Sequence, residues 1–308
     1  MQLRQLRYVL EVHRRGNHIS AAAETLHTSQ PGVSKQIQML ELELGYDIFE
    51  RTRNRVVGLT EPGREVIKII QRVFNDIESL RTIRDDYSRC QEGSLTLATT
   101  HTQVRYVLPK VIDAFIQRYP LVRLSLRQGN PTECCEAVEA GEADLAIGTD
   151  TMRPFPNLVM LPCLQITRSL IARKGHPILD IPELTLEEIA KYPVIAHDPY
   201  RSGRWKIMDA FTKRGIRPNI LFNAVDADVS KTYVELGLGI SILATVAVDP
   251  EHDVGIGARD ASHLFESSVT YVSFRGNAYL RRFVFDFIEM LAPTLTREVV
   301  GAALPRRR

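Results

Sequence analysis

The spacing of apolar residues along this chain of 308 residues changes near residue 93. Over most of the chain before that point, apolar residues recur at every third or fourth position, which predicts helices. After it, short apolar runs of strand length alternate with helical segments, which predicts a parallel sheet covered by helices. The pattern therefore predicts an N-terminal helical part followed by a C-terminal α/β part.

Two short helices joined by a brief turn are expected within the first 60 residues. The first covers residues 19–26, and Ser29 is expected to cap the second. On the second helix Val33, Ile37 and Leu40 share one side, and polar residues face the other way. This arrangement describes a helix-turn-helix, and Gln, Ser and Lys side chains suit the base edges and phosphates of a major groove. An ordinary helical bundle with a polar exposed face has the same periodicity.

Residues 48–59 predict two short strands around a polar turn, the unit called a wing. Arg51, Arg53 and Arg55 fall within it, and phosphates attract such positive charge. An Arg-rich turn alone is usually a solvated loop, but its position directly after a helix-turn-helix favours a contact with the DNA backbone. The whole chain has 39 Lys and Arg against 37 Asp and Glu, a net charge of +2. That balance argues against a broad basic coat and leaves room for a small basic patch.

A long helix is predicted after the wing, capped by Thr60 and running from Arg64 to about Cys90. Its apolar residues alternate spacings of four and three, which is typical of a coiled coil between two copies of a chain. A helix buried within one chain shows the same stripe over three turns. The seam consists of Val66, Ile70, Val73, Ile77 and Leu80, then Arg84 as a charged interruption, and Tyr87.

The segment Ala21–Glu41, followed by Leu44-Gly45 and Phe49-Glu50-Arg51, resembles the LysR-type transcriptional regulators. Thr60-Glu61-Pro62-Gly63 is similar to that family's entry to its linker helix. The resemblance implies that the second helix and the wing lie on double-stranded promoter DNA. Many members have Arg where this chain has Lys35, which replaces a planar bidentate donor with a point charge. The residues expected on DNA are Gln30, Pro31, Ser34, Lys35, Gln36, Gln38, Arg51 and Arg53.

The C-terminal part begins β-α-β-α-β, and its last strand and helix, 268–275 and 278–291, return to the first unit. Two α/β lobes joined by crossing strands resemble the periplasmic-binding-protein-like effector domain of the same family. The crossings are expected near 161–165 and 264–267. The expected fold is thus α/β with an N-terminal all-α winged helix-turn-helix and a long linker helix. The domain boundaries are expected at 1–59, 60–92, 93–163 with 267–308, and 164–266.

Hydroxyl side chains follow three predicted strands or open predicted helices. They lie in Thr99–Gln103, at Thr149 and at Ser202. In open α/β sheets ligands bind beyond the carboxyl ends of strands, where helix N-termini offer free amides. For a single Thr at a helix start, capping of that helix is the commoner explanation. Several together predict a cleft for a small anion or a polar amino-acid-like molecule.

Four further segments, 98–106, 159–163, 226–233 and 247–250, resemble the CysB/Cbl-like subgroup of the family. The resemblance implies an activator of genes for sulfate, sulfonate or thiosulfate uptake and reduction, or for cysteine biosynthesis. It also implies sulfate, acetylserine or adenosine phosphosulfate as effector. The subgroup tends to have an aromatic residue in place of Ile166 and Thr in place of Ser202, so the preferred effector is expected to differ. The expected effector-binding residues are Thr100, Thr102, Gln103, Thr149, Ile166 and Ser202.

Other function classes lack their motifs in this sequence. G-x-S-x-G, H-E-x-x-H and P-loop patterns are absent, so no catalytic residue, metal or cofactor is expected. No apolar run approaches the length of a membrane span, no signal peptide is recognised, and no C-x-x-C pair occurs, which together predict a cytoplasmic protein. Cys134-Cys135 favours two small buried residues over a redox switch.

The expected partners are promoter DNA, a small-molecule effector, RNA polymerase, and further copies of the chain in a homodimer or homotetramer. The alternatives are a LysR-type regulator of another pathway, and a solute-binding protein or enzyme on the same α/β scaffold.

Overall fold

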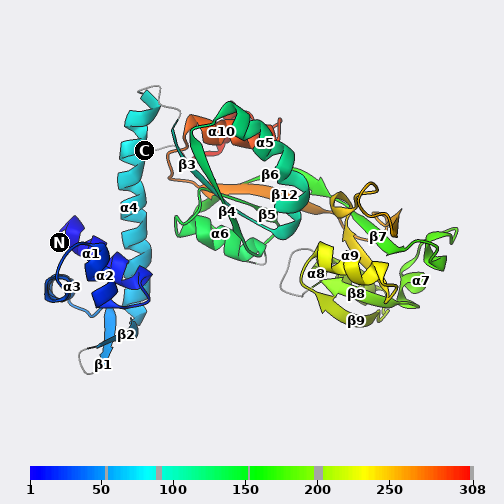
Figure 1. Ribbon diagram of the computed structural model, residues 1–308, viewed down its shortest axis with the longest axis horizontal. Coiled ribbons are helices and arrows are strands. Elements are labelled where there is room, and N and C mark those ends of the chain that lie inside the picture. The colour runs from blue at the N-terminus through cyan, green and yellow to red at the C-terminus, as the bar shows by residue number, and fades with distance from the viewer. Residues whose placement is uncertain (53–54, 88–91, 152, 198–203, 306–308) are drawn as a thin grey trace. The chain divides into compact units, whose positions relative to one another are not determined.

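The computed structural model describes residues 1–52, 55–87, 92–151, 153–197 and 204–305. The chain forms two compact units, Met1–Thr82 and Ile83–Arg308, which are described separately below (Figure 1). Among the described residues, no helix combines the length and the apolar character needed to cross a membrane.

Unit 1 contains the expected helix-turn-helix, wing and long helix. Ser29 caps the second helix of the motif, since its hydroxyl accepts a hydrogen bond from the amide of Gly32 at 3.3 Å. Gly45 ends that helix in the left-handed conformation, with φ of 79°. The elements are α1 (Leu3–Arg14), α2 (Ile19–Thr25), α3 (Gln30–Leu44), β1 (Phe49–Thr52), β2 (Arg55–Leu59) and α4 (Glu61–Tyr87).

The predicted seam of the long helix is divided between two roles. Val66 and Ile70 are buried in the core of unit 1, where Val73 also packs, whereas Leu80 is 69% exposed. The first turns of α4 therefore follow the single-chain alternative, and Leu80 is the exposed one among the apolar seam residues whose side chains are described. Arg84 and Tyr87 carry side chains outside the described part. A coiled coil between two copies stays a prediction.

Gly63 fixes how α4 enters unit 1. The Thr60 hydroxyl accepts a hydrogen bond from the Gly63 amide at 2.9 Å and donates one to the carbonyl of Asp47 at 2.6 Å. A Cβ at Gly63 would lie 2.0 Å from the carbonyl oxygen of Ile48. Real atoms never approach so closely, so glycine is required for the helix to lie against the chain before β1.

Unit 2 contains two lobes, each built on a sheet of five strands (Figure 1). Lobe I has the strand order β4-β3-β5-β12-β6, in which β3 pairs in parallel with β4 and β5, and β12 runs antiparallel to β5 and β6. Its elements are β3 (Gly93–Thr99), η1 (Gln103–Val107), α5 (Leu108–Arg118), β4 (Val122–Gln128), α6 (Pro131–Glu139), β5 (Leu145–Thr149), β6 (Leu158–Ile166), β12 (Ser268–Arg275), α10 (Arg282–Leu291) and α11 (Arg297–Ala303).

The helices of lobe I cover both faces of its sheet. Figure 1 shows α5 and α10 over one face and α6 over the other. Phe115, Phe287 and Ile288 from the first pair are completely buried with the sheet.

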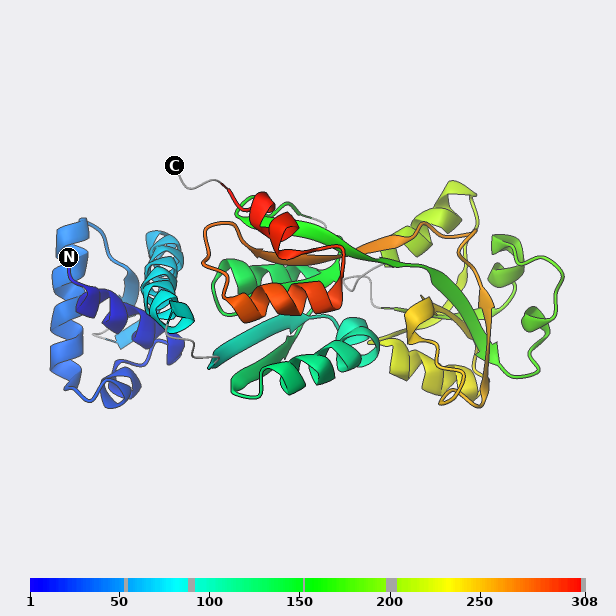
Figure 2. The ribbon, with the colours of Figure 1, turned by 90° about the horizontal axis from the view of Figure 1, so that it is seen from above.

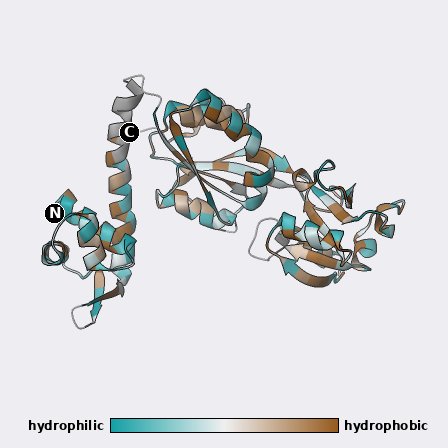
Figure 3. Ribbon diagram, viewed as in Figure 1, coloured by the Kyte–Doolittle hydropathy of each residue, from teal (hydrophilic) through white to brown (hydrophobic). Residues whose placement is uncertain are grey.

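Cys134 and Cys135 of α6 are buried in a separate small cluster, and burial raises their pKa to about 12 and about 11. Low thiolate content suits the packing role expected for them. Each lobe I helix mixes hydrophilic and hydrophobic residues, as an amphipathic cover requires (Figure 3).

Lobe II has the strand order β11-β7-β10-β8-β9. Strand β8 pairs in parallel with β9 and β10, while β7 runs antiparallel to β10 and β11. Its elements are β7 (Arg168–Arg173), η2 (Pro177–Leu179), α7 (Leu186–Ala190), β8 (Pro193–His197), α8 (Arg204–Lys213), β9 (Asn219–Ala224), α9 (Ala227–Glu235), β10 (Ile240–Ala244), η3 (Thr245–Ala247) and β11 (Ile256–Asp260).

The chain crosses between the lobes twice (Figure 2). Strand β6 pairs with β12 as far as Ile166, and β7 begins at Arg168, so the first crossing is at Thr167. Our prediction of 161–165 was a few residues early, because a strand that continues in one sheet looks the same in sequence as one that leaves it. The return lies between β11 and β12, as expected. The domain boundaries themselves stay predictions.

The helix expected from Arg105 begins earlier and contains a wide π-helical turn, η1, before α5. Pro109 explains the difference, because proline has no amide hydrogen and its ring would clash with the carbonyl of Arg105 in a regular helix. The wider turn removes that clash. It also sets the orientation of the segment that begins at Thr100.

Replacement of Gly63 by Ala should lower the free energy of unfolding of unit 1 by about 1–3 kcal/mol, as overpacking does elsewhere. Chemical denaturation followed by circular dichroism measures the change. Gly58→Ala is the matched control, since a Cβ there meets nothing closer than 3.7 Å. Equal stability of the two variants would contradict this account of the close approach.

Candidate functional site

Helix α3 presents the polar face that the sequence predicts. Gln30, Pro31, Lys35 and Gln38 are exposed, while Ser34 and Gln36 are half-buried at its edges. The hydroxyl of Ser20 on α2 donates a hydrogen bond to Gln30 at 3.1 Å, which joins the two helices of the motif at this face. Arg53 lies outside the described residues. The contact of all these side chains with DNA stays a prediction.

Arg51 has a structural partner that the sequence did not reveal. Its guanidinium nitrogens lie 2.6 Å and 3.3 Å from the two carboxylate oxygens of Glu41, a residue of α3 that is 5% exposed. The same carboxylate accepts hydrogen bonds from the amides of Ile48 and Phe49 at 2.8 and 3.2 Å. Glu41 therefore holds the start of the wing against the recognition helix, and Arg51 neutralises its buried charge.

A cavity lies between the two lobes of unit 2. The volume of this cavity is about 60 Å³. Lobe I supplies Thr100, His101, Thr102, Gln103, Asn130 and Thr149. Lobe II supplies Ile207, Val225, Asp226, Ala227, Ile242 and Ala244, while Ile166 and Arg168 flank the crossing. The structure thus brings together every predicted effector residue except Ser202, which lies outside the described residues.

The strand ends explain why hydroxyls collect at this cavity. Thr99 ends β3, Thr149 ends β5, and the two strands are parallel neighbours, so both end at one edge of the sheet. The helical segment after β3 begins at His101, and α6 begins at Pro131 beside it. Amides in a first helical turn have no preceding carbonyl to bond, and the helix dipole favours negative charge there. This edge of the sheet is suited to an anion.

Arg168 is the residue that sequence reasoning missed. It begins β7, is 6% exposed, and donates one hydrogen bond, from Nη2 to the hydroxyl of Ser268 at 2.9 Å. No carboxylate of the described residues forms an ion pair with it, and burial lowers its pKa to about 10. The available signal was a charged residue at the head of the apolar run Leu170-Ile171-Ala172.

Four buried polar atoms at the cavity have no hydrogen-bond partner among the described residues. They are Nε of Arg168, Oγ1 of Thr149, Oε1 of Gln103 and Nδ1 of His101. Gln103 uses its other amide atom, which donates to the hydroxyl of Thr270 at 2.9 Å. A buried polar group without a partner costs about 1–3 kcal/mol. Several such groups around one cavity indicate a polar ligand.

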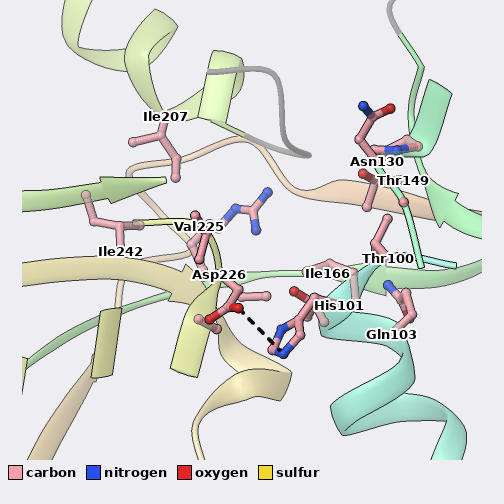
Figure 4. Close-up of a pocket in the computed structure, with 16 residues that line it drawn as sticks. Thr100, His101, Gln103, Asn130, Thr149, Ile166, Ile207, Val225, Asp226 and Ile242 are labelled. Atoms are coloured by element: carbon pink, nitrogen blue, oxygen red, sulfur yellow. Dashed lines mark ion pairs between the residues drawn. The ribbon is translucent and has the colours of Figure 1, made fainter. Parts of the chain in front are cut away.

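Two polar links join the lobes beside the cavity. His101 Nε2 lies 3.9 Å from Asp226 (Figure 4). It also lies 3.4 Å from Asp228, to which the hydroxyl of Tyr106 donates a hydrogen bond. In the second link, Lys206 of α8 lies 3.2 Å from Asp150, the residue after β5. These contacts join lobe I to lobe II near the cavity.

A winged helix-turn-helix together with a two-lobed α/β domain that encloses a polar cavity defines a ligand-responsive DNA-binding protein. Residues 3–64 match the family described as bacterial regulatory helix-turn-helix protein, lysR family, and residues 89–296 match the LysR substrate binding domain. The chain belongs to the LysR family of transcriptional regulators. Members of this family are transcriptional regulators, so the chain is a regulator and not an enzyme. The described residues contain no group of three or more potential metal ligands.

Individual relatives cover nearly the whole chain. It is 46% identical over 304 residues to the transcriptional regulator CysB of Burkholderia cenocepacia, covering 99% of this chain and 97% of that protein. It is also 46% identical over 304 residues to the regulator SsuR of the same species, covering 99% of each. Among solved structures, the cofactor-binding domain of the Cbl transcriptional regulator matches with a TM-score of 0.67 at 38% identity, over 70% of this chain and 95% of that one.

Arg51→Ala should destabilise unit 1 by about 2 kcal/mol, because it leaves the buried Glu41 carboxylate without its charge-assisted hydrogen bonds. Arg55→Ala removes an exposed arginine of the same wing and should change the free energy of unfolding by no more than about 0.5 kcal/mol. Urea denaturation of both variants makes the comparison. An Arg51 variant as stable as the parent would contradict the structural role of Arg51 and leave DNA contact as its one proposed role.

Proposed function

We propose that this chain activates sulfur-assimilation or cysteine-biosynthesis genes in response to a small sulfur-containing anion. The resemblance of four segments to the CysB/Cbl-like subgroup supports the pathway, as does the identity to the regulators CysB and SsuR over nearly the whole chain. The observation that carries the choice of an anion is Arg168, a buried cation at the cavity without an ionic partner among the described residues.

On the DNA side, α3 enters the major groove and the wing follows the phosphate backbone. The polar face of α3 supports this assignment, since Gln reads adenine edges and Lys reaches guanine or phosphate. Arg51 contributes to DNA binding mainly by pairing with Glu41, which holds the wing against α3, and Arg53 is the proposed contact with the DNA backbone. Two copies joined along the later turns of α4 would present two such helices to two half-sites. The promoter-bound dimer or tetramer then contacts RNA polymerase.

On the effector side, the anion binds between Arg168 and the hydroxyl groups of Thr100, Thr102 and Thr149. The guanidinium of Arg168, the three hydroxyl groups and the backbone amides of the first helical turn after β3 surround the anion. The ligand touches both lobes, so its binding favours one arrangement of the lobes over others.

Sulfate should raise the melting temperature of the protein, because a ligand that binds only the folded state stabilises it. Arg168→Gln should abolish that increase. Arg173→Gln removes an exposed arginine of the same strand and should retain it. Differential scanning fluorimetry in chloride buffer measures all three proteins. An undiminished increase in Arg168→Gln would exclude this residue from the site.

Lys35→Ala should weaken binding to all DNA sequences and lower the slope of log K against log salt by about one unit, as the loss of one phosphate contact does. Lys68→Ala is the control, since Lys68 is exposed on α4 and pairs with Glu65 at 2.7 Å. Fluorescence anisotropy with a promoter fragment at several salt concentrations gives both slopes. Equal slopes for the two variants would remove Lys35 from the DNA interface.

A further inference from the structure

We propose that the cavity between the lobes takes a short-chain alkanesulfonate, a monoanion with an apolar tail, in preference to inorganic sulfate. The inference rests on the proposed function, since it assumes that this cavity is the effector site. It adds the chemical class of the ligand and the wall that recognises each end.

The two sides of the cavity differ in polarity. Lobe I supplies hydroxyl and amide side chains, among them Thr100, Asn130 and Thr149. The lobe II side is mainly hydrocarbon: Ile207, Val225, Ala227, Ile242 and Ala244. Figure 4 shows Ile207, Val225 and Ile242 on one side of the cavity, opposite Asn130, Thr149 and Thr100. A ligand that satisfies both sides needs one polar and one apolar end.

Apart from Arg168 at the crossing, Asp226 is the one polar side chain among the described lobe II residues that line the cavity, and it is already engaged within the protein. Asp226 caps α9 by accepting a hydrogen bond from the amide of Val229 at 2.9 Å, and its other oxygen lies 3.9 Å from His101. It cannot donate to an anion.

The charges at the cavity match one negative charge better than two. Arg168 supplies a single permanent positive charge, and His101 faces the carboxylates of Asp226 and Asp228. Among the described residues that line the cavity, Arg168 is the one permanent cation, so the second charge of sulfate would have no lining cation of its own and would lie near Asp226. An unbalanced charge in a buried site is costly. A sulfonate keeps three acceptor oxygens for Arg168 and the hydroxyls and carries only one charge.

The space beyond the apolar wall is also apolar. A second cavity of about 10 Å³ shares Ile207 and Ile242 with the first, and its other walls include Val194, Phe211 and Ile220. An empty apolar space behind the wall allows those two isoleucines to shift by a methyl group without meeting a polar atom. A tail of two or three carbons therefore has an apolar wall to pack against.

Isothermal titration of the full-length protein with methanesulfonate, ethanesulfonate, propanesulfonate, sulfate and acetylserine, in chloride buffer, tests the inference. The anionic end is constant along the sulfonate series, so differences report the apolar wall alone. Each added methylene should lower Kd about fourfold until the space is filled. Ethanesulfonate should bind more tightly than sulfate.

Variants of strand β10 separate the wall from general stability. Ile242→Thr should flatten the dependence of Kd on chain length. Ile240→Thr changes a residue two positions away in the same core cluster that does not line the cavity, so it should keep the dependence. If Ile242→Thr fails to fold, Ala244→Ser places a hydroxyl on the same wall with less disturbance and should reduce the dependence.

The outcomes distinguish this inference from the proposed function. Sulfate binding more tightly than every sulfonate, or a Kd independent of chain length, overturns the inference and leaves a sulfur anion as effector. Tighter binding of acetylserine than of propanesulfonate also overturns it. Binding of none of these ligands overturns both proposals.

Discussion

The connection between the lobes is the constraint on which the effector site depends. One residue, Thr167, separates β6 from β7, so Ile166 and Arg168 on either side of it have little freedom. Ile166 is paired with Ser268, the first residue of the returning strand, and the hydroxyl of Ser268 accepts the hydrogen bond from Arg168. The buried cation is thereby fixed to both strands that join the lobes. In the proposed assignment, a ligand bound to Arg168 contacts the crossing between the lobes directly.

Local sequence signals predicted the elements and the hydroxyl residues of the site, because those depend on neighbours in the chain. Ser29 and Thr60 were recognised as caps, and Thr149 was placed at a strand end by the apolar run before it. Contacts between distant residues were missed. Arg168 is unusual only once the two sheets bury it, and its bond to Ser268 joins residues 100 positions apart.

The same limit explains what the sequence left open in unit 1. The pairing of Glu41 with Arg51 requires the chain to turn between α3 and β1, so neither residue reveals it alone. A heptad spacing also describes a helix packed within its own chain, and only burial of Val66 and Ile70 distinguishes the two uses. The net charge of +2 likewise averages a small DNA-binding unit with a larger effector unit. The three-dimensional structure was therefore needed to show which charged residues pair within the protein.

The links between the lobes limit what a ligand is able to change. His101 and Tyr106 contact Asp228, and Lys206 contacts Asp150, so the lobes are held together without a ligand. A ligand shifts a conformational equilibrium only through a difference in its affinity for the two arrangements. Contacts at the crossing, such as those of an anion with Arg168, change little when one lobe turns about that point. Contacts with Ile207 and Val225 depend on the lobe angle. In the proposed assignment, the anionic end supplies affinity and the apolar tail supplies the difference between the two arrangements, which is why an amphipathic effector suits this cavity as a signal.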